Sequence, residues 1–131
     1  MDEPCFIYKR RVFFADTDAS GVAHFSRLLC IVEEAEHQAL RSVGIAVLSR
    51  DCGWPRVHLD INYRSSGALN EELSVCIKPC KIGVSSLEWV VEVSCGTRLV
   101  LDGAYTVVRV GSGGGKMPIP LNERKNLESL M

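Results

Sequence analysis

The sequence predicts one α+β domain in which a single long helix packs against an antiparallel sheet. Three observations point to this class. They are a strand-like run near the amino end, one long amphipathic segment, and four strand-like runs in succession joined by short turns. The length of 131 residues suits one domain with a real hydrophobic core and is small for two.

The first strand is expected over residues 6–14. Aromatic and β-branched side chains, which favour extended backbone, are frequent there. The basic run Lys9-Arg10-Arg11 within it is typical of a strand face that contacts water. A turn of small residues follows this strand and separates it from the long amphipathic segment.

The long helix is expected over residues 26–43. Apolar side chains recur there at spacings of three and four residues, which places them on one broad face: Leu28, Val32, Ala35, Ala39 and Val43. The polar residues that fill the other positions include Glu33, Glu34 and Glu36. Ser26 suits the N-cap, because its hydroxyl can accept from an unpaired backbone N–H, and Gly44 suits the left-handed position that ends a helix.

Four more strands are expected, over residues 57–64, 73–81, 86–95 and 98–110. Alternation is clear in the third of these, where every second residue is apolar: Leu87, Trp89, Val91 and Val93. Short turns between consecutive strands indicate an antiparallel meander. Gly103, inside the last strand, indicates a β-bulge.

The chain beyond this sheet is expected to be a flexible glycine-rich linker and C-terminal tail over residues 111–131, with a short helix over residues 122–130. The domain itself is therefore expected over residues 1–110. The glycine run at 111–116 does not match a phosphate-binding P-loop, because Met117 stands at the Ser/Thr position and Pro118 prevents the required helix.

The composition gives no case for a nucleic-acid or membrane partner. The net charge is −1, and no apolar run approaches the ~20 residues of a membrane span. The amino end lacks the basic start and apolar stretch of a signal peptide, so a cytoplasmic location is expected. None of the six cysteines forms a Cys-x-x-Cys pair, and we expect small buried thiols in a reducing compartment with no metal site.

The chemically distinctive stretch is Asp16-Thr17-Asp18, directly before the helix. A carboxylate beside the amino end of a helix combines a base or nucleophile with free backbone N–H donors. Acyl transfer needs this combination, because one group attacks while the donors stabilise the oxyanion. The same spacing also suits aspartates that shape a turn or cap the helix.

The segment Asp-Thr-Asp-Ala-Ser-Gly-Val-Ala-His-Phe resembles the signature of the 4-hydroxybenzoyl-CoA thioesterase family in the hotdog-fold superfamily. The resemblance implies a curved antiparallel sheet wrapped around the long helix. It also implies that Asp18 is the catalytic carboxylate, while Asp16 fixes the turn. Phe25 is the position expected to offer its backbone N–H to the thioester carbonyl, and Gly21 is expected to permit close backbone approach.

Further site residues are expected from the same resemblance. His24 is either a residue that orients the acyl group or a packed structural residue. His58 is likewise either a substrate contact or a structural residue of its strand. The segment Pro55-Arg56-Val57-His58 is similar to one in the dihydroxynaphthoyl-CoA thioesterase subgroup. The candidate contacts to coenzyme A are Arg64, Lys81, Ser85 and Ser86, and each of these positions also suits a solvated charge or a turn residue. Another hotdog branch has its catalytic carboxylate on the helix, where Glu33 and Glu34 otherwise occupy ordinary surface positions.

The resemblance implies an acyl-CoA thioesterase that acts on an aromatic acyl group and needs no metal or redox cofactor. It also implies a homo-oligomer that is at least a dimer, and a homotetramer is expected. Two other functions stay open from the sequence. One is a hotdog dehydratase that acts on hydroxyacyl thioesters, and the other is a module that binds acyl thioesters without catalysis.

Overall fold

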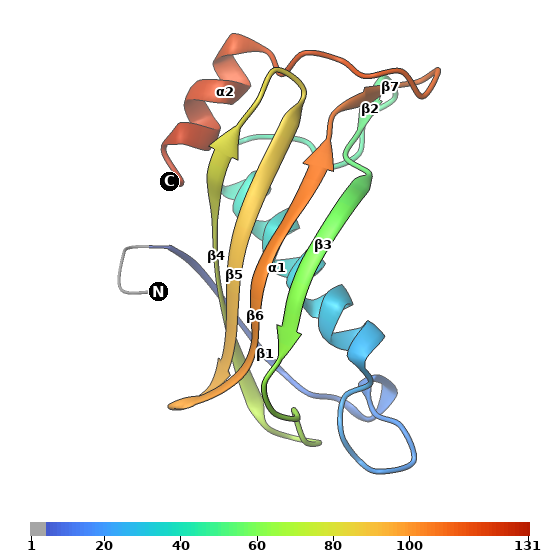
Figure 1. The fold of residues 1–131 in the computed structure, drawn as a ribbon, viewed down its shortest axis with the longest axis vertical. Helices are drawn as coiled ribbons and strands as arrows, with labels where there is room; N and C mark the ends of the chain where they lie inside the picture. The colour runs from blue at the N-terminus through green and yellow to red at the C-terminus, as the bar shows by residue number, and fades with distance from the viewer. Residues whose placement is uncertain (1–4) are drawn as a thin grey trace.

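The computed structural model describes residues 5–131 and shows an antiparallel sheet curved around one long helix (Figure 1). Five strands form this sheet in the order β1-β4-β5-β6-β3. Their bounds are β1 Phe6–Arg11, β3 Arg56–Tyr63, β4 Glu72–Ile82, β5 Ser86–Cys95 and β6 Arg98–Val108. The predicted α+β class is confirmed, and β5 begins and ends at the residues that its alternation predicted.

The hydrophobic core lies between the sheet and α1 (Phe25–Ser42), which crosses one face of the sheet (Figure 1). The helix contributes the buried apolar side chains Leu28, Ile31, Val32, Ala35, Ala39 and Leu40. The strand β5 contributes Leu87, Trp89, Val91 and Val93, each at most 1% exposed. Full burial of one large apolar side chain stabilises a fold by about 1.5–3 kcal/mol, so this helix–sheet contact is the main source of stability.

The first turn of α1 differs from the prediction, since the helix begins at Phe25 and His24 caps it instead of Ser26. The Nδ1 atom of His24 accepts a hydrogen bond from the Ser26 backbone N–H at 3.2 Å. Ser26 is therefore inside the helix. At the other end, Gly44 has φ +75°, the left-handed conformation expected of the residue that follows a helix.

Gly103 stays in register with both neighbouring strands, so the bulge predicted there is wrong. One register shift of the sheet falls instead between Arg56 and His58 on β3. Gly103 serves a close approach: a Cβ atom at this position would lie 2.2 Å from the Asp60 carbonyl oxygen. Only glycine lets β3 pair with β6 at this point.

The C-terminal segment packs against the domain, in contrast to the flexible tail expected over residues 111–131. Strand β7 (Val110–Gly111) pairs with β2 (Cys52–Gly53), and α2 (Leu121–Glu128) lies beside the turn that joins β4 to β5 (Figure 1). Ile119 is 5% exposed and Leu127 is fully buried, and both belong to the hydrophobic core.

Polar contacts also hold α2 in place. The guanidinium of Arg124 donates to the carbonyl oxygens of Ile82 at 3.3 Å and Gly83 at 2.6 Å. The side-chain amide of Asn126 donates to the Val43 carbonyl oxygen at 3.0 Å, just beyond the end of α1. These acceptors come from distant parts of the chain, which explains why a local reading of the tail missed the docking.

The cysteines also depart from the prediction. Cys5 and Cys76 form a disulfide that joins the start of the described chain to β4, and Cys30 is exposed on α1. Among residues 5–131, no group of His, Cys, Asp and Glu side chains is arranged to hold a metal ion. Neither helix of the described chain is long and apolar enough to cross a membrane.

Candidate active site

Asp16 is fully buried and anchors the loop between β1 and α1. Its carboxylate pairs with Arg10 at 2.6 Å and Arg27 at 3.0 Å, and it accepts from the Phe13 backbone N–H at 2.9 Å. Burial alone would raise the pKa of Asp16, but the hydrogen bonds from Arg10, Phe13 and Arg27 outweigh it and lower the pKa to about 2. This geometry agrees with the turn-fixing role expected for Asp16.

Asp18 lies two residues further along the same loop and is exposed. Its Oδ1 atom accepts hydrogen bonds from the Ser20 hydroxyl and from the Ser20 backbone N–H, the latter at 2.8 Å. These two bonds, with a smaller contribution from nearby His24, lower the pKa of Asp18 below its usual range. Gly21, at φ +79°, closes the turn by donating to the Asp18 carbonyl oxygen at 3.1 Å. Asp18 is therefore an ionised carboxylate that faces solvent.

The start of α1 leaves one backbone donor available. The N–H groups of Ser26, Arg27 and Leu28 all donate to atoms of His24. Within residues 5–131, no acceptor is found for the Phe25 N–H. The free N–H groups and the dipole of a helix start favour negative charge, so Phe25 can offer a donor to an oxyanion.

A hollow of about 280 Å³ opens beside this helix start. It is lined by Ala23, Phe25, Leu28, Tyr63, Arg64, Ser65 and Ser66. The Phe25 ring is 59% exposed and meets the edge of the Tyr63 ring at 6.3 Å between centroids. The Tyr63 hydroxyl donates to the Phe25 carbonyl oxygen at 3.3 Å, so this tyrosine ties β3 to the start of α1.

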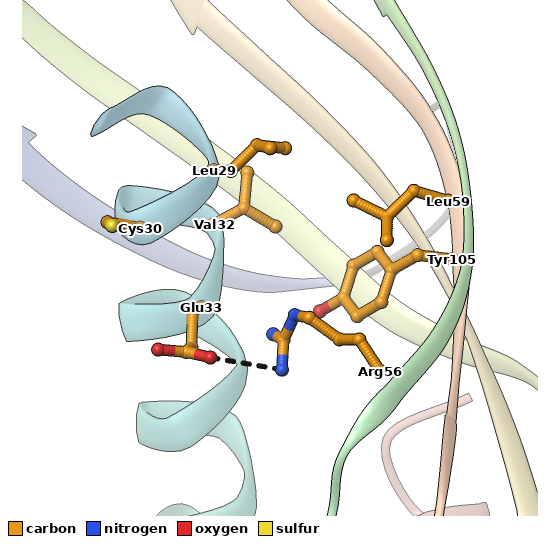
Figure 2. Close-up of a pocket in the computed structure, with 7 residues that line it drawn as sticks. All are labelled: Leu29, Cys30, Val32, Glu33, Arg56, Leu59 and Tyr105. Carbon is orange, nitrogen blue, oxygen red and sulfur yellow. Dashed lines mark ion pairs between the residues drawn. The ribbon is translucent and has the colours of Figure 1, made fainter. Parts of the chain in front are cut away.

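A second, more apolar pocket of about 140 Å³ lies further along α1, between the helix and β3 (Figure 2). It is lined by Leu29, Cys30, Val32, Glu33, Arg56, Leu59 and Tyr105. Figure 2 shows Arg56 and Tyr105 reaching from the strands toward α1, with the Arg56 guanidinium paired to Glu33 at 3.1 Å. The pocket thus has apolar walls and one charged end.

Behind this charged end lies Glu36, whose carboxylate is fully buried. Its Oε1 atom pairs with Arg56 at 2.6 Å and accepts from the Tyr105 hydroxyl at 2.7 Å. Its Oε2 atom accepts no hydrogen bond from any residue in the described part of the chain. Burial raises the pKa of Glu36, although the Arg56 charge and the Tyr105 hydrogen bond oppose this rise.

Three residues of this pocket and its charged end are not among the predicted site residues: Glu36, Arg56 and Tyr105. Glu36 was expected among the polar positions of the helix. A signal for Glu36 was present, because it stands four residues after Val32 and four before Leu40, inside the apolar face of the helix. A carboxylate on such a face needs a buried partner. The partner, Arg56, could not be identified, since only the fold brings β3 beside α1.

The two helix carboxylates considered from the sequence also reach across to the sheet instead of facing solvent alone. Glu33 pairs with Arg56 at the charged end of the pocket. Glu34 pairs with Arg10 at 2.9 Å and accepts from the Tyr8 hydroxyl at 2.8 Å. Glu34 therefore ties β1 to α1, while Glu33 belongs to the pocket.

Five of the predicted site residues gather at one end of the folded domain, around the start of α1: Asp18, Gly21, His24, Phe25 and Arg64. The Nδ1 atom of His24 is engaged by the helix cap, and its ring packs 4.4 Å from the Phe25 ring, between centroids. Arg64 shares the hollow with Phe25 and pairs with Asp102 at 3.2 Å.

The other predicted site residues lie away from the start of α1 in the single chain. Lys81, Ser85 and Ser86 are at the turn between β4 and β5, at the opposite end of the sheet from the loop that carries Asp18 (Figure 1). His58 lies on the face of the sheet that points away from α1. It lines a separate pocket there with neighbours such as Thr106, whereas the next residue, Leu59, faces the helix side.

Known proteins resemble this chain in sequence and in fold. The Thioesterase superfamily matches residues 20–101. A 1,4-dihydroxy-2-naphthoyl-CoA hydrolase of Nostoc punctiforme is 32% identical over 93 residues, which make up 68% of this chain and 63% of the relative. The chain thus spans less than two thirds of that relative. A hydrolase of the same name from Synechococcus sp. (strain CC9902) is 31% identical over 72% of this chain and 69% of the relative.

The fold comparison covers nearly the whole chain. The 1,4-dihydroxy-2-naphthoyl-CoA thioesterase of Synechocystis superposes with a TM-score of 0.86 at 24% identity, over 95% of this chain and 96% of that one. A gentisyl-coenzyme A thioesterase superposes with a TM-score of 0.85 at 20% identity, over 92% and 98% of the two chains. This agreement confirms the predicted hotdog fold. With the family match over residues 20–101, it follows that the chain belongs to the Thioesterase superfamily.

Proposed function

We propose that the protein hydrolyses acyl-CoA thioesters to a carboxylate and coenzyme A. The observation that carries this proposal is the exposed, ionised Asp18 beside a helix start whose first N–H, on Phe25, is available. An attacking or proton-accepting group next to an oxyanion donor is what acyl transfer requires. The relatives named as 1,4-dihydroxy-2-naphthoyl-CoA hydrolases support a CoA thioester of an aromatic acid as the substrate.

In the proposed reaction, the thioester oxygen accepts a hydrogen bond from the Phe25 N–H, and the dipole of α1 stabilises the negative charge that develops there. Asp18 has two possible roles. It attacks the carbonyl carbon to form a mixed anhydride that water then cleaves, or it takes a proton from the water that attacks. In both cases the C–S bond breaks and coenzyme A leaves as the thiolate. His24 would orient the acyl group through its second ring nitrogen, since Nδ1 caps the helix.

The proposal includes a homodimer in which two β3 edges pair in an antiparallel way. β3 is one edge of the sheet, and it exposes apolar side chains there, with Val57 at 60% and Tyr63 at 45%. An exposed apolar edge strand favours pairing with another chain. A two-fold axis at β3 would bring the partner's β4–β5 turn to the end that carries Asp18. Residues Lys81, Ser85 and Ser86 would then contact coenzyme A bound across the interface.

The two alternatives have less support in this geometry. A dehydratase would need a histidine and a carboxylate together at the acyl chain. His58 faces away from α1, and His24 has its Nδ1 in the helix cap. A binding module without catalysis would not need an ionised carboxylate beside an available oxyanion donor.

One assay separates the three functions. The protein is incubated with aromatic, short-chain and long-chain acyl-CoAs while free thiol is measured, and the products are identified by mass spectrometry. Thiol release that depends on the protein supports the thioesterase. Formation of an alkene with no thiol supports the dehydratase, and binding without turnover supports the module, and either result would overturn the proposed function.

A further inference from the structure

The C-terminal segment packs on the turn between β4 and β5, where Lys81, Ser85 and Ser86 lie (Figure 1). We propose that this segment, chiefly through Arg124 of α2, holds the turn in the conformation that binds the phosphates of coenzyme A. Arg124 is then a positioning residue, because it acts on the ligand through the backbone of the turn. This role rests on the proposed thioesterase function and adds to it an element that sets the affinity for the coenzyme.

Arg124 binds the first half of the turn from the side of α2. Its guanidinium donates to the carbonyl oxygen of Ile82 at 3.3 Å and to that of Gly83 at 2.6 Å. Because the guanidinium is planar and presents its donors in a fixed geometry, one side chain fixes two successive peptide groups. The C=O and N–H of a trans peptide point in opposite directions. The bond to the Gly83 carbonyl oxygen therefore directs the Val84 N–H away from Arg124.

The segment before α2 fixes the next peptide group. The Ile119 N–H donates to the Val84 carbonyl oxygen at 2.8 Å. By the same geometry, this bond directs the Ser85 N–H away from Ile119. The backbone N–H of Arg109 donates to the Ser85 carbonyl oxygen, also at 2.8 Å. The carbonyl oxygens of residues 82–85 therefore all have donors within the chain.

The donor groups of the turn are left free by the same arrangement. Among residues 5–131, no acceptor is found for the backbone N–H of Val84 or of Ser85. The hydroxyls of Ser85 and Ser86 likewise make no hydrogen bond with the described residues. Gly83 leaves room for the Ser86 hydroxyl, which a Cβ atom at position 83 would overlap. Successive free N–H groups in a turn form a concave site for anions, so this turn suits a phosphate.

Positive charge accompanies these donors. Lys81 is exposed beside the turn, and the guanidinium of Arg124 lies against its carbonyl oxygens. Glu123, the acidic neighbour of Arg124 in α2, is paired with Arg109 at 2.5 Å and is thereby neutralised. Phosphate oxygens form strong hydrogen bonds with N–H and O–H donors and attract cations. Coenzyme A carries such phosphates, whereas its thioester end does not.

Two thioesters of one acyl group separate a role in coenzyme binding from a general effect on the fold. The first is the CoA thioester of an aromatic acid that the wild type cleaves. The second joins the same acid to N-acetylcysteamine, which ends before the phosphates and so lacks the proposed contact with the turn. The variants are Arg124→Met and Arg124→Lys. Lys125→Met is the control, because it removes a charge from an exposed neighbouring position on α2.

Arg124→Met should raise KM for the CoA thioester by about 5- to 20-fold with little change in kcat, the scale of weakened hydrogen bonds to a charged group. KM for the N-acetylcysteamine thioester should keep its wild-type value. Arg124→Lys should also raise KM for the CoA thioester, because an ammonium lacks the planar fork that binds two carbonyl oxygens. Lys125→Met should keep the wild-type values for both thioesters.

Three results would overturn the inference, each measured on protein that circular dichroism shows to be folded. An unchanged KM for the CoA thioester in both Arg124 variants would show that the turn needs no support from α2. An equal loss on the two thioesters would show a structural role with no preference for the coenzyme. A KM raised by Arg124→Met but not by Arg124→Lys would show that Arg124 acts through its charge. If Arg124→Met does not fold, the milder Arg124→Lys decides between the same results.

Failure of the proposed function would look different. If no acyl-CoA releases thiol, the thioesterase proposal is lost, but calorimetry with free coenzyme A still tests the turn. The dissociation constant should rise in Arg124→Met by the same factor as expected for KM, and it should keep its wild-type value in Lys125→Met. Equal dissociation constants in all three proteins, or no binding to the wild type, would contradict the inference by this route.

Discussion

Asp16 and Asp18 stand two residues apart in one loop, and their surroundings give them different tasks. Asp16 is buried, and its carboxylate forms ion pairs with two arginines that hold the loop in place. Asp18 faces solvent and accepts hydrogen bonds from the hydroxyl and backbone N–H of Ser20. Both carboxylates are ionised at neutral pH, but only Asp18 is accessible to a substrate. The loop therefore separates a buried structural carboxylate from an exposed, accessible one.

The role of Asp16 predicts a loss of stability when its charge is removed. Asp16→Asn keeps the size of the side chain but leaves Arg10 and Arg27 without their anion. The free energy of unfolding at neutral pH should fall by at least about 1 kcal/mol, as for a lost hydrogen bond to a charged group. Denaturant titration measures this loss, with the exposed Asp60→Asn as the control.

The pH dependence of stability follows from the same group. The folded pKa of Asp16, about 2, lies below its ordinary value of 3.8. Its contribution to stability is therefore complete above that ordinary value and is lost as the pH falls toward the folded pKa. The wild type should lose more stability over this interval than Asp16→Asn does. Equal losses in the two proteins would show that Asp16 is not the anchor of the loop.

At the scale of the elements, the periodicity of apolar residues predicted where a strand lies and which side chains of the helix face the core. The strand at 86–95 and the burial of Val32, Ala35 and Ala39 are examples, because each side chain's face follows from its position in the element. Contacts between distant segments could not be predicted. The burial of Glu36 depends on Arg56 and Tyr105, which lie 20 and 69 residues further along the chain.

The C-terminal helix shows the same limit. Its apolar positions are few, and the surface that receives Leu127 is built by residues far away in the sequence. The loop that carries Asp18 could be recognised because its motif is continuous in sequence. The pocket could not, because it exists only where α1, β3 and β6 meet.

The docking of α2 predicts that its one buried leucine matters to stability and its exposed leucine does not. Leu127 is fully buried and Leu121 is 68% exposed on the same helix. Leu127→Ala should lower the free energy of unfolding by about 2–5 kcal/mol, as for other buried leucines. Leu121→Ala should change it by less than about 0.5 kcal/mol. Thermal and denaturant unfolding of the two variants test this. Equal changes in the free energy of unfolding would indicate that the tail is not docked.

At the scale of the whole molecule, the sheet has two edges, β1 and β3, and the candidate site lies toward the β3 side. The pocket and the hollow are both lined by residues of β3 and α1. A second chain paired along β3 would cover both openings. It would also bring its own Lys81, Ser85 and Ser86, at the β4–β5 turn, to the end of the sheet that carries Asp18. Catalysis and assembly are therefore expected to depend on the same strand.

Charges at the β3 edge should separate the chains. Val57→Lys with Tyr63→Lys places two like charges on each edge, where two copies would have to meet. Light scattering should give at least twice the mass of one chain for the wild type and the mass of one chain for this variant, which should also lose thiol release. Ile7→Lys on the opposite edge, where Ile7 is 57% exposed, is the control and should keep the wild-type mass. A wild-type protein that is monomeric at micromolar concentration would contradict the paired β3 edges.

The most direct test of the proposed function is the turnover number of Asp18→Asn on an acyl-CoA that the wild type cleaves. Asparagine keeps the shape of the side chain and its bond from Ser20 but can neither attack a thioester nor accept a proton. The turnover number should fall by at least about 10²-fold, the scale of a lost general base. KM should change little, because the residues proposed to bind coenzyme A are other than Asp18. Circular dichroism must show that the variant is folded. Turnover near the wild-type value in folded Asp18→Asn would contradict the proposal that Asp18 attacks the thioester or accepts the proton of the attacking water.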